Sequence, residues 1–241
     1  MGKKRGQLRI GTSGYHYDHW KSVFYPESIK KTEWFSYYSE RFSTVEINNT
    51  FYKLPSIKTF ESWHDQAPNN FRYAIKYSQY ATHSKRLKDP EQPLETFLSN
   101  AEHLKSFLGP ILVQLPGNWK ANPDRLEAFL KAAPGRHRWT LEFRDPSWLN
   151  EDCYRILRDH NAALCIQDML DDHPREITAN WLYMRFHGDH YGGSYTKKQL
   201  RGEADFIKDH LDEGRDVYVY FNNDKDGYAV QNALTLEELT G

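Results

Sequence analysis

The sequence of 241 residues has little cysteine, no long apolar run and almost no net charge. Its two cysteines, Cys153 and Cys165, are too few for a disulfide framework, and no paired CxxC motifs indicate a zinc site. No stretch approaches the ~18 apolar residues of a membrane-spanning helix, and no apolar segment follows the basic residues 1–5. We therefore expect a protein of the reducing cytoplasm that does not enter a membrane.

The charge balance also excludes one class of function. There are 32 Lys and Arg against 33 Asp and Glu, so the surface as a whole is no electrostatic trap for nucleic acid, although a local basic groove is compatible with this balance. No GxGxxG motif follows the first predicted strand, and no GxxxxGK[ST] motif occurs. The absence of both nucleotide-binding motifs disfavours an open, doubly wound nucleotide-binding sheet.

What the sequence does contain is a regular alternation of short apolar runs with helical patterns. Runs rich in β-branched and aromatic residues predict eight strands, and each of the first seven is followed by a loop and a helical pattern. The predicted strands are residues 8–13, 44–48, 72–77, 110–115, 139–144, 163–168, 182–187 and 216–222. Together with a length near ~250 residues, this predicts an α/β protein with a single (β/α)₈ barrel domain over residues 1–241.

Two of the expected helices have clear limits. One begins at residues 122–124, where Asn-Pro-Asp offers a cap with proline at the first helical position, and ends at residues 134–135. The preceding helix is expected over residues 94–108, with Gly109 and Pro110 ending it.

Polar residues alternate with apolar ones in several of these strands. Successive strand residues face opposite sides, so Glu46 and Asn48 share one face while Val45 and Ile47 share the other. The apolar face must meet the helices, which directs the polar face into the barrel, where the carboxyl ends of strands build active sites. The polar residues placed there are Glu46, Asn48, Lys76, Gln114, Glu142, Arg144, Asp168, Arg185, His187, Tyr220 and Asn222.

Three loops add candidates at the same end. Tyr15 follows the first strand and brings an aromatic ring to the barrel mouth. Residues 187–194 are rich in glycine, which lets backbone amides approach a phosphate, although such a loop can also be a plain flexible connection. The basic residues 83–88 are either a solvated loop or a contact for a phosphate backbone.

Several motifs together resemble the YecE-like family, a domain of unknown function found in bacteria and archaea. They cover residues 10–15 with Trp20 and 24–26, then 44–52, 114–116, 142–148, 185–188 and 220–224. The resemblance spans nearly the whole chain and implies a TIM-barrel fold, but no established activity. The family has been likened in shape to metal-dependent DNA-repair endonuclease barrels, which is an analogy and assigns no site.

The favoured hypothesis is a hydrolase or lyase that needs no metal or other cofactor and acts on a small anionic or sugar-like substrate. Glu46 and Glu142 would form a carboxylate pair for acid–base work, with His187 and Asp168 as further proton-transfer candidates. The cations among these acids would repel a divalent metal and hold a substrate anion. The predicted substrate-binding residues are Tyr15, Asn48, Lys76, Gln114, Arg144, Arg185, Tyr220 and Asn222.

Two alternatives remain open. A metal-dependent phosphoesterase acting on nucleic acid would use oxygen and nitrogen ligands from four strands, namely Glu46, Glu142, Asp168 and His187, with His16, His19 and His190 as further candidates. No HxxxH signature supports it. A non-catalytic binding protein would hold a ligand without turning it over. The same polar residues would also suit a buried ion-pair network that merely fixes the core, for example between Glu142 and Arg185.

Overall fold

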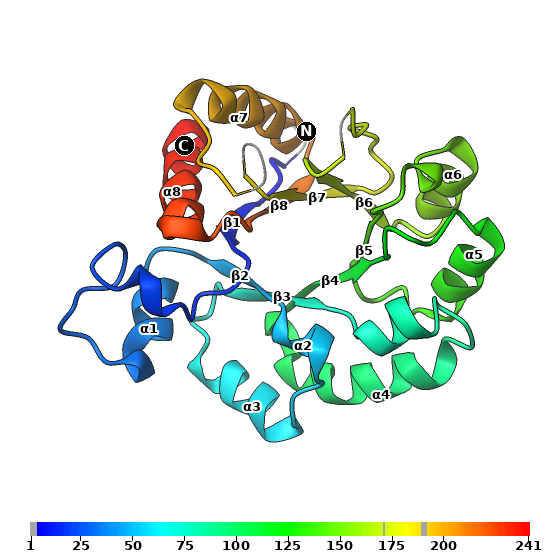
Figure 1. Cartoon of the computed structure of the whole chain (residues 1–241), viewed down its shortest axis with the longest axis horizontal. Helices are drawn as coiled ribbons and strands as arrows, with labels where there is room; N and C mark the ends of the chain where they lie inside the picture. Colours follow the sequence, from blue (N-terminus) through cyan, green and yellow to red (C-terminus); the bar gives the residue numbers. More distant parts are fainter. Residues whose placement is uncertain (1–3, 171, 189–191) are drawn as a thin grey trace. The chain divides into compact units, whose positions relative to one another are not determined.

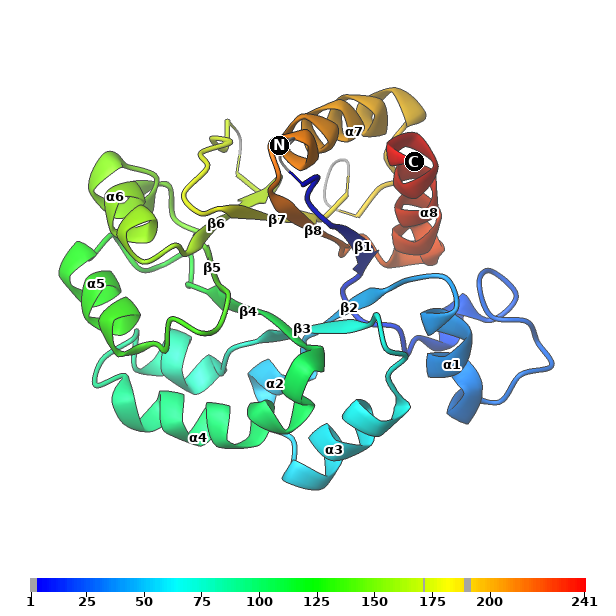
Figure 2. The same cartoon turned by 180° about the vertical axis from the view of Figure 1, so that it is seen from behind.

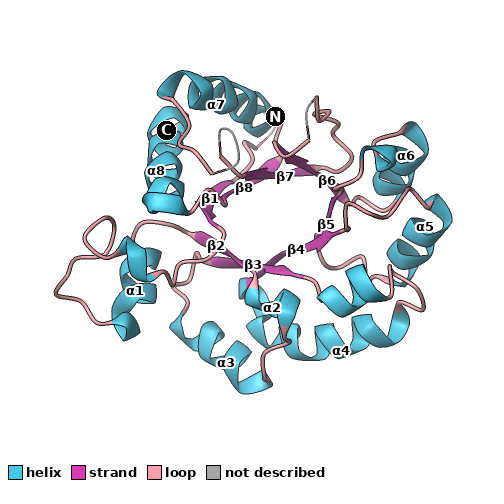
Figure 3. Cartoon of the chain, in the orientation of Figure 1, coloured by secondary structure: helices cyan, strands magenta, loops and turns pink. Residues whose placement is uncertain are grey.

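The structure is a computed structural model that describes residues 4–170, 172–188 and 192–241. Among these residues, eight strands follow one another along the chain, with helices after every strand except β6 (Figure 3). The strands are β1 (Leu8–Thr12), β2 (Thr44–Ile47), β3 (Arg72–Lys76), β4 (Leu108–Gln114), β5 (Trp139–Glu142), β6 (Ala163–Gln167), β7 (Trp181–Phe186) and β8 (Asp216–Phe221).

The helices flank these strands in sequence order. They are α1 (Trp34–Ser39), α2 (Asn49–Tyr52), α3 (Ile57–Gln66), α4 (Glu91–Ala101), α5 (Pro123–Ala132), α6 (Glu151–Asp159), α7 (Lys197–Asp212) and α8 (Tyr228–Thr240). One π-helix covers Tyr80–Ser84, and short 3-10 helices cover Asp18–Trp20, Lys31–Glu33, Glu102–Phe107, Pro146–Trp148 and Lys225–Gly227.

The strand order confirms the predicted (β/α)₈ barrel. All eight strands belong to one sheet in the order β1-β8-β7-β6-β5-β4-β3-β2. The described registers, such as Leu8 opposite Val217 in β1 and β8, are parallel, as strands joined by helical crossovers must be. A parallel bridge between Ser13 and Glu46 also joins the end of β1 to β2.

Two compact units make up the chain. The first comprises Met1–Glu46, Gln167–Met169 and Trp181–Gly241, and in it α7 and α8 pack on each other and against β8 (Figure 1). The second comprises Ile47–Ile166 and Leu170–Asn180. In it β3, β4 and β5 pair in sequence, and α3 packs against α4 and the 3-10 helix that follows (Figure 2).

Local sequence signals explain where the helices begin. The side chain of Asn122 accepts a hydrogen bond from the Arg125 N–H and Pro123 is the first residue of α5, so the predicted cap is confirmed. Thr196 caps α7 in the same way, and Gln199 reaches back to the Thr196 N–H. This capping box fixes the backbone directly after the loop that follows β7.

The helix predicted over residues 94–108 is wrong at both ends. α4 begins at Glu91 and ends at Ala101, a 3-10 helix follows, and β4 already begins at Leu108. The apolar spacing continues to Leu104, which is buried, but Lys105 adopts φ +50°, and this left-handed backbone ends the helical run.

The prediction of a helix after each of the first seven strands is also wrong for β6. The described residues between β6 and β7 contain turns and bends but no helix. Pro174 lies within this short connection and has no N–H for a helical bond. The Thr178 hydroxyl donates to Ala162 O (2.7 Å) and accepts from Leu164 N–H (2.8 Å), which ties the segment to β6 instead.

Within the described part of the chain, no helix combines the length and apolar content needed to cross a bilayer. Both cysteines are buried.

Candidate functional site

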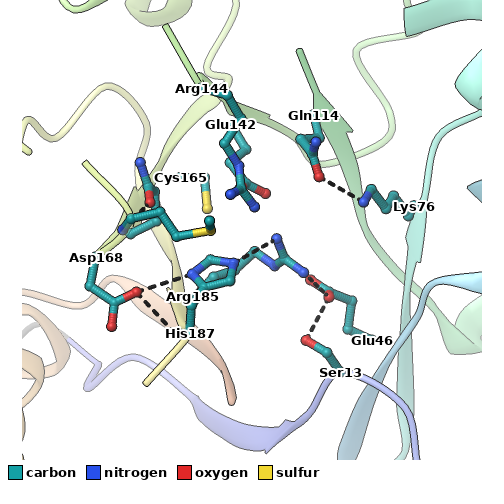
Figure 4. A network of polar contacts seen from close by, with 12 residues as sticks. Ser13, Glu46, Lys76, Gln114, Glu142, Arg144, Cys165, Asp168, Arg185 and His187 are labelled. Carbon is teal, nitrogen blue, oxygen red and sulfur yellow. Dashed lines mark hydrogen bonds and ion pairs between the residues drawn. The ribbon is translucent and has the colours of Figure 1, made fainter. Parts of the chain in front are cut away.

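The first unit carries a chain of polar side chains at the carboxyl ends of its strands (Figure 4). Tyr183, Arg185 and His187 lie two residues apart along and just beyond β7, so they share one face of the strand, as the alternation predicts. Glu46 comes from β2 and Asp168 directly follows β6. The backbone therefore brings residues from three strands to the same place.

Glu46 is fully buried and both of its carboxylate oxygens are engaged. Its Oε1 accepts from Ser13 Oγ (2.7 Å) and Arg185 Nη2 (2.8 Å), and its Oε2 accepts from the Tyr183 hydroxyl (2.5 Å). Burial alone would raise the pKa of Glu46, but the charge of Arg185 and these hydrogen bonds outweigh it and hold that pKa below its ordinary value. Glu46 is thus an ionised anchor for Arg185.

His187 lies between a carboxylate and a guanidinium. Its Nδ1 is 3.0 Å from Asp168 Oδ1, and its Nε2 is 3.2 Å from Arg185 Nη1. Because a guanidinium can only donate, Nε2 must be the acceptor, and the ring proton sits on Nδ1 and points to Asp168. The partners of His187 thus define a neutral imidazole whose basic nitrogen faces Arg185.

Asp168 holds this imidazole and is itself held by its neighbours. Its Oδ1 also accepts from the His187 backbone N–H (2.9 Å), and its Oδ2 accepts from the Tyr195 hydroxyl. Burial would raise the pKa of Asp168, but the hydrogen bonds from His187 and Tyr195 together outweigh burial and hold that pKa below its ordinary value. The Tyr195 hydroxyl in turn accepts from Gly188 N–H (2.6 Å).

Two buried asparagines hold the backbone of Tyr195 in place, one directly and one through the other. Asn232 of α8 accepts from the Tyr195 N–H and donates to the Tyr195 carbonyl, both at 3.2 Å. Asn223 follows β8 and donates to Asn232 Oδ1 and Gly193 O, both at 2.9 Å. The backbone at Tyr195 is therefore fixed on both its N–H and its C=O.

Sequence reasoning missed five of these residues, which are Ser13, Tyr183, Tyr195, Asn223 and Asn232. The alternation with a period of two that singled out Arg185 also marks Tyr183, so Tyr183 could have been predicted from the sequence. Tyr195 and Asn232 carried no signal, because a contact between a loop and a helix far along the chain leaves no local pattern. Asn223 was marked only as a member of the motif at residues 220–224. Ser13 lay in the predicted strand 8–13 and in the motif at residues 10–15, but nothing distinguished it from its neighbours.

The other predicted residues of the first unit lie in varied settings. Tyr220 is fully buried, and its hydroxyl is 2.6 Å from Thr44 Oγ1. Tyr15 is half-buried against the rings of Phe35 and Tyr38, and Asn222 is half-buried at the end of β8. Contact of these three residues with a substrate stays a prediction.

The second unit carries its own polar pairs at strand ends. Lys76 Nζ donates to Gln114 Oε1 (2.7 Å) and lies 4.2 Å from the centre of the Phe51 ring. Glu142, fully buried, forms an ion pair with Arg144. Asn48 is half-buried directly after β2. Because Glu46 and Glu142 belong to different units, their action as a pair stays a prediction.

The ligands considered from the sequence form no metal cluster among the described residues, although Asp168 and His187 are in contact. No group of three or more His, Cys, Asp or Glu side chains there has a geometry that could hold a metal ion. His16 packs against Trp34 with ring centres 4.9 Å apart, and His19 Nε2 is 3.2 Å from Asp224 Oδ2. His190 and residues 189–191 of the glycine-rich loop lie outside the described residues.

Comparison with known proteins gives consistent relatives. A sequence profile described as "Protein of unknown function DUF72" matches residues 9–241. The UPF0759 protein YunF of Bacillus subtilis (strain 168) is 27% identical over 96% of this chain and 94% of that protein. The UPF0759 protein YecE of Escherichia coli O157:H7 is 29% identical over 57% of this chain and 52% of that protein.

Solved structures agree with these sequence relatives. The crystal structure of a DUF72 family protein from Thermotoga maritima MSB8 has 28% sequence identity and a TM-score of 0.86, over 97% of this chain and 98% of that chain. The resemblance to YecE-like proteins is confirmed, and none of these names states an activity.

Proposed function

The chain belongs to the DUF72 family, whose description assigns no activity, and we propose that it is an acid–base enzyme in which His187 moves a proton. The reaction is a hydrolysis or an elimination of a small anionic or sugar-like substrate in the cytoplasm. This proposal keeps the reaction class and substrate class favoured by the sequence, and it assigns the proton transfer to one imidazole.

The observation that carries the proposal is the pair of contacts on the His187 ring. Asp168 fixes the proton on Nδ1 and leaves Nε2 as the base. Only 7% of the His187 side chain is exposed, so the ring has one orientation and little competing water. A carboxylate behind a histidine also stabilises the imidazolium that forms when the base accepts a proton.

Arg185 is the natural contact for a substrate anion. Its Nη2 is anchored to Glu46, whereas its Nη1 donates to His187 Nε2. A substrate phosphate or carboxylate that accepts from Nη1 frees the lone pair on Nε2 beside the bound substrate. His187 then takes a proton from an attacking water or from a carbon acid and returns it to the leaving group. Glu46 is a positioning residue in this scheme, because both its oxygens are already engaged.

The test is a substrate panel with a matched histidine control. Wild-type protein is incubated in D₂O with sugar phosphates, hydroxycarboxylates and amino acids, and NMR follows deuterium exchange and product formation. His187→Gln removes the base. His137→Gln is the control, because His137 is also nearly buried and bonded to a carboxylate, Glu102 (3.0 Å), but it precedes β5 and lies at the amino end of that strand.

General acid–base groups contribute about 10²–10⁴-fold to a rate, so the His187→Gln variant loses turnover by at least about 100-fold while the His137→Gln variant keeps it. Turnover that survives in His187→Gln contradicts the assignment. Saturable binding without exchange or product, unchanged in His187→Gln, supports a non-catalytic binding protein instead.

A further inference from the structure

Two tyrosines of the second unit are more exposed than aromatic side chains usually are. Tyr52 is 74% exposed and Tyr80 is 57% exposed, whereas most large aromatic residues that the structure describes are buried or half-buried. Tyr52 ends α2, the short helix after β2, and Tyr80 begins the π-helix after β3. Solvent-exposed tyrosines in the short helices that follow the carboxyl ends of barrel strands suit contact with a ligand.

Phe51 joins the two elements that carry these tyrosines. Its ring centre is 5.1 Å from that of His83 in the π-helix, and Lys76 Nζ lies 4.2 Å from the Phe51 ring centre. Thr50 of α2 also donates to Lys76 O at the end of β3 (2.7 Å), and α2 lies beside β3 in both views (Figures 1 and 2). Tyr52 and Tyr80 therefore belong to two elements, α2 and the π-helix, that are linked through Phe51.

These elements are rich in basic residues. Residues 49–55 and 76–88 contain five Lys and Arg and no Asp or Glu, in a chain whose net charge is −1, and the one acid that directly follows, Asp89, lies 3.6 Å from Lys85 Nζ. The cations are Lys53, Lys76, Lys85, Arg86 and Lys88. π-Helical turns of this kind are frequent at functional sites.

The backbone of residues 86–89 is held in an unusual conformation. Arg86 and Leu87 have φ of +48° and +59°, a region that residues with a side chain rarely adopt. The buried Leu87 side chain and a hydrogen bond from Arg125 Nη1 to Arg86 O (3.0 Å) fix this turn. Strained backbone persists where the surroundings over-determine it, and here it presents basic residues in a defined loop.

We propose that Tyr52, Lys53, Tyr80, Lys85, Arg86 and Lys88, called here the Tyr52–Tyr80 surface, bind single-stranded nucleic acid. The two tyrosines stack on bases and the four cations contact phosphates. Aromatic rings interleaved with Lys and Arg are the general means by which proteins hold single strands without reading sequence. This surface lies in the second unit and does not depend on the role given to His187.

The experiment measures binding of a fluorescent 15-nucleotide oligothymidylate by anisotropy, at several salt concentrations, with the full chain. Tyr52→Leu and Tyr80→Leu remove one ring each, and Tyr52→Phe restores a stacking face. A triple variant, Lys85→Gln with Arg86→Gln and Lys88→Gln, removes three cations. The matched control changes Lys197, Lys198 and Arg201 to Gln on α7, where all three are exposed.

Each Leu variant lowers the affinity for the oligothymidylate on the order of ten-fold, and the affinity of Tyr52→Phe stays near that of the wild type. The triple variant lowers the slope of log K against log salt by about 2, because each phosphate contact on a single strand adds about 0.7. Circular dichroism verifies that each variant is folded.

Three results would overturn the inference. The first is no binding to the wild type at low salt. The second is equal affinity for a polyphosphate without bases, or for duplex DNA, because neither offers free bases to stack. The third is binding that is abolished by the α7 control and unchanged by both Leu variants.

Discussion

Replacing Glu46 by Gln probes the anchor on which the His187 arrangement depends. The change keeps the shape and removes the charge that Arg185 contacts at 2.8 Å. The side chains of Glu46 and Arg185 are 0% and 2% exposed, so water cannot replace the lost partner. Removing one partner from a buried ion pair costs about 3–5 kcal/mol, which for a chain of this length lowers the thermal midpoint by about 10 °C.

The direction of the pH dependence follows from the lowered pKa of Glu46. A carboxyl whose pKa is lower in the folded state stabilises the fold at pH values above its unfolded pKa, about 4.3. That contribution is lost as the pH falls through the folded pKa. The difference in stability between wild type and Glu46→Gln is therefore full at pH 7 and shrinks in acid.

The assay is thermal and urea unfolding followed by circular dichroism, from pH 7 downward. The control is Asp152→Asn, which removes a partner of Arg155 in a pair whose side chains are 73% and 64% exposed. Exposed pairs contribute about 0–1 kcal/mol, so this control changes little. A Glu46→Gln protein within about 0.5 kcal/mol of wild type at pH 7 would refute the reasoning.

Three further changes test other parts of the structure. Tyr195→Phe removes the hydroxyl between Asp168 and Gly188 and costs about 1–3 kcal/mol, with faster hydrogen exchange at the Gly188 amide; unchanged exchange would contradict the contact. Asn232→Leu leaves the N–H and C=O of Tyr195 without these partners and costs on the order of 3 kcal/mol in urea unfolding, whereas a neutral result would show that the loop needs no support. Burial raises the pKa of Glu237 to about 7, so the wild type loses stability as the pH rises from about 4.3, the unfolded value, to about 7. Glu237→Gln is then more stable than wild type at pH 8 and not at pH 4, and an equal difference at both pH values would contradict this.

The architecture could be predicted because local sequence patterns, namely apolar strand runs and helix caps, determine it. Short buried strands separated by capped helices, such as α5 with Asn122 and Pro123, define the barrel order without any knowledge of contacts. Between β6 and β7 the described residues form no helix, and only Pro174 signalled this in the sequence. The hydrogen bonds of Thr178 to Leu164 and Ala162 leave no local pattern.

The candidate site was predictable in its residue types and less so in its pairings. Alternation along β7 correctly placed Arg185 and His187 on one face. It could not show that Glu46 is the carboxylate that anchors Arg185, because that contact joins β2 and β7. The hydrogen bond from Tyr195 to Asp168 likewise joins residues 27 positions apart, which no spacing in the sequence encodes.

The central claim is that His187 is a neutral base with its proton on Nδ1. Long-range ¹H–¹⁵N NMR of the histidine rings measures this directly, with the His187 signals assigned by their absence in His187→Gln. We expect one protonated nitrogen, Nδ1, and one bare nitrogen, Nε2, at pH 8, with the preference for Nδ1 lost in Asp168→Asn. A proton on Nε2, or a doubly protonated ring at pH 8, would contradict the account.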